Sequence, residues 1–450
     1  MKLLLAAFSG VRVQNARLME LGLTLPGFVE RSRVIASLPS LGLLTLASHT
    51  PPGWEVEYRE FDQFGEPELS AILADGFDVV AISALSARIL EAYAVADRLR
   101  DKGVCVVMGG LHVTALPDEA SQHADSVVIG EGEPVWEQLL LDYEQGCLRP
   151  RYSSFAAPRF DLSQSRTPRY DLLDISRYNR LTLQTTRGCP LDCEFCAASR
   201  TLSTYKMKPL ETVRRDLEAI LALWPRPFLE LADDNTFVKK SWSRQLASLL
   251  KEYPVRWFTE CDISIADDPE LLELLATSGC VQVLIGLESA EPEGLRGLDS
   301  RGWKLARYNS YHEKIARIQS YGISVNGCFI MGLDSHTAET FEQTRRFVQE
   351  SALSEVQLTV LTPFPGTALY RRLQGEGRLP DQPYWDRCTL FDVVFEPARM
   401  SMGELEAQFE DLMAAVYSDD MVAARKANFR RCLRSAAAHR AERDENERAV

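Results

Sequence analysis

The chain has 450 residues, of which 46% are hydrophobic and 25% are charged. That composition is typical of a folded globular protein with a large core, and it excludes a fibrous or largely disordered chain. At roughly 150 residues per domain, the length predicts about three domains. The 64 acidic residues outnumber the 50 basic ones, for a net charge of −14. An acidic chain repels a phosphate backbone, so we expect no nucleic acid as a partner.

Two further features bear on the location of the protein. No apolar run approaches the ~18 residues that cross a bilayer, so we expect no membrane span. The apolar run Leu3–Phe8 stops at Ser9 and Gly10, which favours a first strand over a secretory signal. In a chain without an export signal, the ten cysteines favour a reducing, cytoplasmic environment in which thiols are buried or bind metals.

Residues 1–145 alternate strand-like runs with helical patterns. Helical spacing predicts a helix that begins at Leu85 and ends at Gly103, and Pro117 opens a short one. Strands that alternate with helices predict an α/β fold with a Rossmann-like, doubly wound parallel sheet, whose ligands bind beyond the carboxyl ends of the strands. The predicted strands are Leu3–Phe8, Trp54–Glu60, Asp78–Ala84, Val104–Met108 and Ser126–Ile129.

The rest of the chain predicts a connector, a second α/β domain and a helical end. Residues 146–180 carry three prolines and no sustained period, which is typical of a connector. Residues 181–373 contain six strand–helix units, which predict a partial (β/α)6 barrel with its catalytic residues at the carboxyl ends of the strands. Residues 374–450 predict a cap and a helical C-terminal region. The barrel strands are expected at Leu181–Thr186, Phe228–Ala232, Arg256–Cys261, Val281–Leu287, Ser324–Met331 and Val356–Leu361.

Three of the ten cysteines, Cys189, Cys193 and Cys196, lie in the run TTRGCPLDCEFC at positions 185–196. The run follows the first predicted barrel strand, so the three thiols share one loop. Three thiolates on a short loop can hold one iron–sulfur cluster and leave one iron of a four-iron cluster open to another ligand. A zinc site is the alternative, but structural zinc usually takes four ligands in two pairs, and no second pair appears nearby.

The spacing C-x3-C-x-aromatic-C resembles the signature of the radical S-adenosylmethionine (SAM) enzymes over about residues 180–373. The resemblance implies a [4Fe–4S] cluster on Cys189, Cys193 and Cys196, with SAM bound to the open iron and Phe195 near its adenine. It also implies that one electron from the cluster splits SAM into methionine and a 5′-deoxyadenosyl radical, which abstracts hydrogen from a C–H bond.

Polar residues at the later strand ends fit the same resemblance. Asp233, Asp234 and Asn235 follow the second barrel strand, where the family binds the amino group of SAM, although its usual GGE form is absent here. Glu288 and Ser289 end the fourth strand, where the family contacts the ribose or carboxylate of SAM. The remaining candidate is Asn326 on the fifth strand. A helix cap or a surface charge is the alternative role for each acidic residue.

The first domain resembles the amino-terminal domain of cobalamin-binding radical SAM proteins, through a Gly109-Gly110 pair after one strand and the run GEGE at 130–133 after another. The resemblance implies that cobalamin lies against the carboxyl edge of this sheet. The D-x-H-x-x-G string whose histidine ligates cobalt is absent, which leaves a cobalamin-free docking domain as the alternative. The expected cobalamin contacts are Ser83, Gly109, Gly110, His112 and Gly130.

These features lead to one principal hypothesis and two alternatives. The principal one is a cobalamin-dependent radical SAM methyltransferase that acts on an unactivated carbon of a small-molecule, natural-product type substrate, with flavodoxin or ferredoxin as electron donor. The first alternative is a cobalamin-free radical SAM dehydratase, cyclase or epimerase, and the second is a cluster-carrying scaffold or redox sensor. Tyr205, Lys206 and Glu260 are the candidate acid or base residues at the barrel mouth, with loop contacts and strand packing as their alternative roles.

Overall fold

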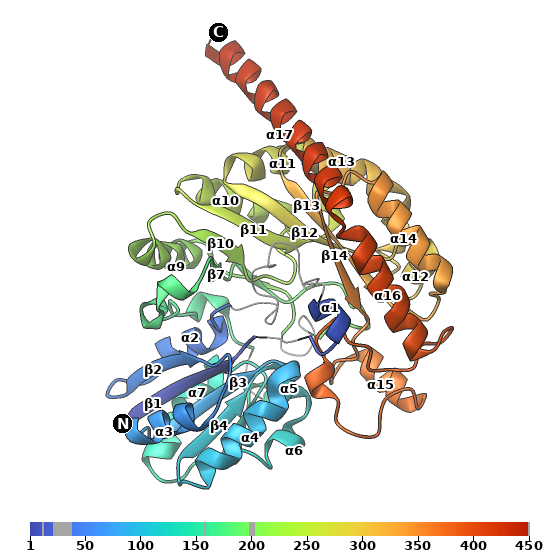
Figure 1. Ribbon diagram of the computed structural model, residues 1–450. Coiled ribbons are helices and arrows are strands. Elements are labelled where there is room, and N and C mark those ends of the chain that lie inside the picture. Colours follow the sequence, from blue (N-terminus) through green and yellow to red (C-terminus); the bar gives the residue numbers. More distant parts are fainter. Residues whose placement is uncertain (11–12, 21–37, 157–158, 198–202, 449–450) are drawn as a thin grey trace.

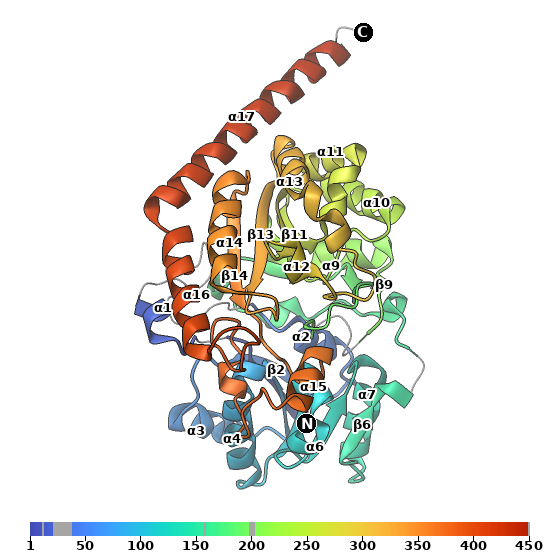
Figure 2. The same ribbon diagram turned by 90° about the vertical axis from the view of Figure 1, so that its right-hand side faces the viewer.

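The structure is a computed structural model that describes residues 1–10, 13–20, 38–156, 159–197 and 203–448. Figures 1 and 2 show two α/β domains, one above the other, with a helical C-terminal region along one side. Pro158, one of the three prolines of the predicted connector, lies outside the described residues. No helix within the described ranges is both long and apolar enough to cross a membrane.

The first domain is a six-stranded parallel sheet in the order β2-β1-β3-β4-β5-β6. This is the predicted doubly wound sheet. The segment predicted as a connector contributes the edge strand β6, whose three residues are too few to show a period. The strands are β1 (Lys2–Phe8), β2 (Glu55–Glu60), β3 (Val79–Ala84), β4 (Cys105–Gly109), β5 (Ser126–Ile129) and β6 (Arg151–Ser153).

Helices cover both faces of this sheet, because alternate side chains of each buried strand point to opposite faces. In β1, Leu3 and Leu5 pack on the side of α2 (Leu41–Ser48) and α7 (Glu133–Glu144). Leu4 and Phe8 pack on the opposite side. There they pack against α3 (Glu66–Asp75) and α4 (Ile89–Arg100). The domain also has three shorter helices among the described residues: α1 (Ala16–Glu20), α5 (Leu111–Ala115) and α6 (Pro117–Ala120).

The second domain is an open barrel of six parallel strands in the order β14-β13-β12-β11-β10-β7, as predicted. The strands are β7 (Leu181–Leu183), β10 (Phe228–Leu231), β11 (Arg256–Cys261), β12 (Cys280–Glu288), β13 (Ser324–Met331) and β14 (Glu355–Val360). The helices outside them are α9 (Leu210–Leu223), α10 (Lys240–Lys251), α11 (Pro269–Thr277), α12 (Pro292–Leu295), α13 (Tyr311–Ser320) and α14 (Ala338–Glu350).

The strand predicted at Leu181–Thr186 is broken in two. After β7 the chain turns away from the barrel, because the carboxylate of Asp233 accepts the backbone N–H groups of Thr185 and Thr186. The chain then forms an antiparallel ribbon of β8 (Thr186–Arg187) and β9 (Lys206–Met207). This ribbon stands between the two domains and leads directly into the cysteine loop.

The C-terminal region links the two domains. Trp385 and Cys388 pack in the core of the first domain, whereas Phe391 and Phe395 pack in the core of the barrel. Cys388 is therefore a buried packing thiol that lies away from the barrel cavity. The helices are α15 (Ala368–Gly375), α16 (Met402–Val416) and α17 (Asp419–Arg448), and α17 projects away from the body of the molecule (Figures 1 and 2).

Candidate active site at the junction of the two domains

The cysteine loop is fixed to the structure around it at several points. Gly188 has a φ of +80°, and a Cβ atom there would lie 2.8 Å from the carbonyl carbon of Thr204, so only glycine fits this close approach. Asp192 accepts the backbone N–H of Ser300 at 2.9 Å. Glu194 forms a two-pronged ion pair with Arg372 of α15, at 2.8 and 3.1 Å. The loop is therefore held in one shape by elements far away in the sequence.

The three cysteine side chains line one cavity of about 330 Å³ at the carboxyl end of the barrel, together with Phe195. Burial raises the pKa of the Cys189 thiol, and raises that of Cys193 to about 12. Metal binding at these thiols must therefore release their protons. Among the described residues, no group of three His, Cys, Asp or Glu side chains closes around a single metal ion.

The three polar residues after β10 have different roles in the structure. Asp233 is buried, and its carboxylate accepts hydrogen bonds from Thr185, Thr186 and Thr236. Burial raises the pKa of Asp233 to about 6, while these hydrogen bonds oppose the shift. Asp233 does not line the cavity. Its carboxyl group holds the chain in place at the break after β7. Of the three residues that follow β10, Asp233 is therefore the one whose expected contact with SAM the geometry does not favour.

Asn235 and Asp234 line the barrel cavity beside the cysteines. The amide nitrogen of Asn235 donates to Asp262 at 3.1 Å and lies 3.8 Å from the Sγ atom of Cys189. Its carbonyl oxygen is buried and has no partner. A buried acceptor without a donor is costly, and the amino group of SAM would supply one. The residues therefore fit SAM next to the cluster loop.

The end of β12 presents a second anchor for SAM. Glu288 has a φ of +66° and follows a register shift in the pairing of β12 with β13. Bulges and positive φ at non-glycine residues re-aim side chains at functional sites. The carboxylate of Glu288 lines the cavity and pairs with the buried Lys304 at 2.7 Å. Ser289 points elsewhere, toward the buried His336, so the expected SAM contact of Ser289 is not supported by its position.

Glu260 and Asn326 lie on the inner side of the barrel. Glu260 lines the cavity at the end of β11. Glu260 is exposed to the open cavity, yet the surrounding barrel shields it from water and raises its pKa to about 8, and the nearby carboxylates of Glu230, Asp234 and Glu288 add to the shift. Asn326 does not line this cavity, but its carbonyl oxygen is also buried without a partner. The cavity is lined mainly by apolar side chains, among which Glu260, Gln357 and Thr359 place a few polar groups.

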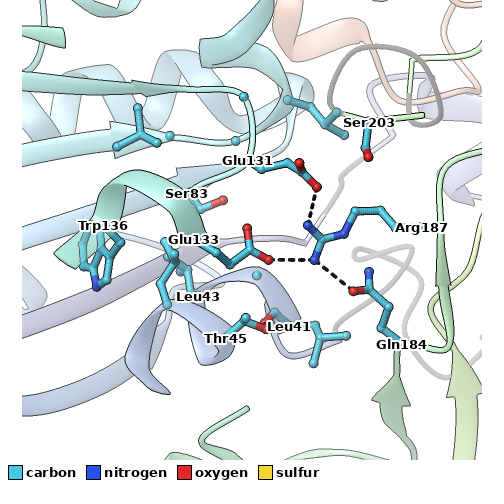
Figure 3. A pocket seen from close by; sticks show the side chains of 18 of the residues that line it. Leu41, Leu43, Thr45, Ser83, Glu131, Glu133, Trp136, Gln184, Arg187 and Ser203 are labelled. Atoms are coloured by element: carbon cyan, nitrogen blue, oxygen red, sulfur yellow. Dashed lines mark hydrogen bonds and ion pairs between the residues drawn. The ribbon is translucent and has the colours of Figure 1, made fainter. Parts of the chain in front are cut away.

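A second cavity, of about 340 Å³, lies between the first domain and the barrel (Figure 3). The first domain lines it with the carboxyl ends of β3, β4 and β5 and with α2, and the barrel contributes Gln184, Arg187 and Asp234. Asp234 lines both cavities, and it accepts the backbone N–H of Gly188 at 2.8 Å. Among the described residues, Asp234 is therefore a wall shared by the two cavities.

The expected cobalamin contacts divide into two groups. Ser83, Gly109, Gly110 and Gly130 line the cavity between the domains. A Cβ atom at Gly130, where φ is +87°, would lie 2.3 Å from the Oγ atom of Ser154, so only glycine lets the end of β5 pack this closely against the segment after β6. These residues fit cobalamin.

His112 is the exception, because it does not line this cavity and its position does not support the expected contact with cobalamin. It is buried outside the cavity, between Ser86 at 3.0 Å and Glu119 at 3.2 Å, with its ring edge-on to Trp385. No histidine is among the described residues that line this cavity.

Two of the three candidate acid–base residues, Lys206 and Tyr205, lie outside the barrel cavity. The ammonium group of Lys206 donates to both carboxylate oxygens of Glu131 and to the carbonyl of Phe160. It is therefore a contact between domains and does not line the barrel cavity. Tyr205 also lies outside that cavity, with a buried hydroxyl group that has no partner. Of the three, only Glu260 faces the barrel interior.

The sequence interpretation missed Lys304 and Arg187. Arg187 lies two residues before the first cysteine, and this position beside the cysteine motif was the one sequence feature that could have indicated its role. Lys304 lies in an irregular stretch before α13 and has no such signal.

Comparison with known proteins agrees with this architecture. Residues 33–140 match the B12 binding domain, residues 183–348 match the radical SAM superfamily, and residues 367–449 match a domain of unknown function, DUF4070. The chain belongs to the radical SAM enzymes that carry an amino-terminal B12-binding domain. Its cofactors are accordingly a [4Fe–4S] cluster, SAM and cobalamin, and the residues described above fit all three.

Three relatives illustrate the range of this group. The chain is 27% identical over 360 residues to bacteriochlorophyllide d C-12(1)-methyltransferase of Chlorobaculum tepidum, which covers 77% of the chain and 76% of that protein. It is 28% identical to the hopanoid C-2 methylase of Rhodopseudomonas palustris, over 77% of the chain and 66% of that protein. The structure of the radical SAM methyltransferase TsrM from Kitasatospora setae, with cobalamin and a [4Fe–4S] cluster, covers 91% of this chain and 85% of its own, with a TM-score of 0.65 and 17% identity. At that identity TsrM supports the shared fold alone.

Proposed function

We propose that this protein is a cobalamin-dependent methyltransferase that adds a methyl group to an unactivated carbon of a small molecule. One observation carries the proposal: the cavity between the domains and the cavity beside the three cysteines meet at Asp234, which lines both. A substrate carbon near this residue would face the radical source on one side and the methyl source on the other.

The bound cofactors supply the electron that splits SAM and the methyl group that is transferred. The residues of the chain hold these cofactors in position. Asn235 holds the amino group of SAM through its unpartnered oxygen, and Glu288, braced by Lys304, holds the ribose. The glycines at the ends of β4 and β5 leave space for the corrin, and Arg187 closes the cavity from the barrel side.

For the substrate, the electron donor and the location of the protein, we infer a class and not an individual molecule. The two relatives above are named for a bacteriochlorophyllide and a hopanoid, and we infer by analogy a natural-product type small molecule. The mainly apolar lining of the barrel cavity, with Glu260 and Gln357 as isolated polar groups, suits a largely apolar substrate that carries a few polar groups. Flavodoxin or ferredoxin is the proposed electron donor. We place the protein in the cytoplasm, because a cluster held by thiolates suits a reducing compartment and none of the ten cysteines forms a disulfide.

Anaerobic reconstitution tests the proposal. The protein is loaded with iron, sulfide and hydroxocobalamin and desalted, and iron and cobalt are measured on the same sample. It is then incubated with SAM and a low-potential reductant. We expect about four irons and one cobalt per chain, with both 5′-deoxyadenosine and S-adenosylhomocysteine as products. Cys193→Ala is the control, and it should lose the cluster and both products.

Each alternative hypothesis predicts a different result in the same experiment. Four irons and 5′-deoxyadenosine without retained cobalt and without S-adenosylhomocysteine would favour a cobalamin-free dehydratase, cyclase or epimerase. A loaded cluster that never splits SAM would leave only a scaffold or redox role.

A further inference from the structure

The GEGE run at 130–133 contains two glutamates whose role the cofactors do not explain. Both carboxylates lie at the junction of the domains and face the barrel (Figure 3). Glu131 accepts Arg187 at 2.7 Å and Lys206 at 2.7 and 2.8 Å. Glu133 accepts Arg187 at 2.7 Å. Two anions of the first domain therefore meet two cations of the barrel domain.

The two cations come from one small element of structure. Arg187 and Lys206 are directly opposite each other in the antiparallel pairing of β8 with β9. Opposite residues in such a pair lie on the same face of the ribbon. The amide oxygen of Gln184 accepts a further hydrogen bond from Arg187 at 2.9 Å, which fixes the plane of the guanidinium group. The ribbon thus presents a rigid pair of cations to the first domain.

The network is buried and balanced in charge. The side chains of Glu131 and Glu133 are 8% and 7% exposed, and that of Arg187 is 17% exposed. Removal of one partner of a buried ion pair leaves the other charge uncompensated and is strongly unfavourable. The four groups therefore hold the domains together only as a complete set.

The network also connects the two cofactor sites through short paths. Arg187 is two residues before Cys189, in the strand that leads into the cluster loop. Glu131 and Glu133 follow β5 at the start of α7, and both line the cavity between the domains, as does Trp136 of α7. Any rotation of one domain against the other must first break these pairs.

We propose that Arg187 is a positioning residue that locks the GEGE loop of the B12-binding domain to the cluster-bearing strand and so sets the space in which cobalamin binds. The inference rests on the proposed function, because it takes cobalamin as the ligand of this cavity. Arg187 acts through Glu133 and Glu131, so its effect on cobalamin binding depends on those carboxylates being present.

The test uses the full chain with its cluster loaded and hydroxocobalamin as the probe. The variants are Arg187→Met, Arg187→Lys, Glu133→Gln and the double variant Arg187→Met/Glu133→Gln. Arg88→Met is the matched control, because Arg88 is a buried arginine that pairs with Glu91 inside the first domain and does not line the cavity between the domains. Iron content, the dissociation constant for hydroxocobalamin and amide hydrogen exchange over residues 126–144 are measured for each.

We expect Arg187→Met to keep about four irons and to raise the dissociation constant by about tenfold or more, as for other truncated buried charge pairs. Amide exchange over residues 126–144 should rise in the cobalamin-free protein. Arg187→Lys, which keeps the charge without the two-pronged geometry, should recover part of the affinity. The double variant should bind no more weakly than Arg187→Met alone, because the two residues act through one interaction.

Two results would overturn the inference. One is unchanged cobalamin affinity and unchanged exchange in Arg187→Met. The other is independent, multiplying losses in the double variant, which would mean that Arg187 contacts the ligand itself. A wild-type protein that retains no cobalamin would instead contradict the proposed function, and the exchange data would still report whether Arg187 locks the junction.

Discussion

The ammonium group of Lys304 lies 2.7 Å from the Oε1 atom of Glu288, at the point where β12 leaves its regular pairing with β13. The same ammonium group donates to the carbonyl of Gly286 at 2.8 Å. Lys304 therefore braces both the backbone of the bulge and the side chain that the bulge aims into the barrel cavity. Since Glu288 has a φ of +66°, this strained position needs such support.

Lys304→Met should weaken SAM binding without removing the cluster. The carboxylate of Glu288 would lose its buried partner and its fixed direction, and we expect the dissociation constant for SAM to rise by about tenfold or more. Equilibrium dialysis with the cluster-loaded protein measures this. Lys314→Met removes an exposed pair with Asp267 and serves as control. Equal affinity in Lys304→Met and wild type would show that Glu288 does not contact SAM.

Asn235→Leu should abolish the response of the cluster to SAM. The substitution keeps the approximate volume but removes the unpartnered carbonyl oxygen that is expected to accept the amino group of SAM. Electron paramagnetic resonance of the reduced cluster measures the effect, since ligand binding at the open iron changes the spectrum. We expect the wild-type spectrum to shift on SAM addition and the variant spectrum to stay unchanged. Asn428→Leu, in the C-terminal helix α17, is the control. A normal shift in Asn235→Leu would assign the amino group to another residue.

SAM cleavage should slow as the pH rises through about 8, because Glu260 ionises there. Its pKa is raised to about 8 by the partial loss of water inside the barrel cavity and by the carboxylates of Glu230, Asp234, Glu288 and Asp233. Below that pH Glu260 is neutral, and above it the cavity gains a further negative charge. The rate of 5′-deoxyadenosine formation between pH 6.5 and 9 measures this. Glu260→Gln, which mimics the neutral form, should lack the decline, whereas superimposable profiles for variant and wild type would exclude Glu260 as its source.

The fold could be predicted closely from the sequence, because its signals are local. Runs of buried apolar residues with polar ends gave the strands Ser126–Ile129, Arg256–Cys261 and Ser324–Met331 with the bounds that the structure has. The three cysteines are likewise a local motif, and the loop that carries them does bring them to one cavity.

Side-chain direction at the strand ends could not be predicted in the same way. Asp233 and Asp234 are adjacent, yet one supports the chain break after β7 and the other lines both cavities. Ser289 follows a bulge, which turns it from the cavity toward His336. The partners of Arg187 and Lys206 lie more than 50 residues away, so spacing alone contains no sign of the ribbon that pairs them with Glu131.

Acid should destabilise the barrel through His336. This ring is buried; its Nδ1 atom accepts the N–H of Gly332 at 3.3 Å, its Nε2 atom lies 3.4 Å from the hydroxyl of Ser289, and Glu291 is 4.0 Å away. Burial lowers the pKa of His336 to about 4, from 6.5 in an unfolded chain. Between these values the unfolded chain binds more protons, so the free energy of unfolding falls as the pH drops below 6.5.

Protonation of His336 in the unfolded chain should lower the free energy of unfolding by about 1 kcal/mol between pH 7 and pH 5.5. Urea unfolding at the two pH values measures the loss for wild type and for His336→Gln, which keeps a hydrogen-bonding group but cannot gain the charge. The loss should be smaller in His336→Gln by about that amount, while His312→Gln, at an exposed position of α13, should behave like wild type. Equal losses in all three proteins would mean that the ring escapes to solvent before it is protonated, and that the packing of Gly294 against Ser289 and His336 does not hold it in place.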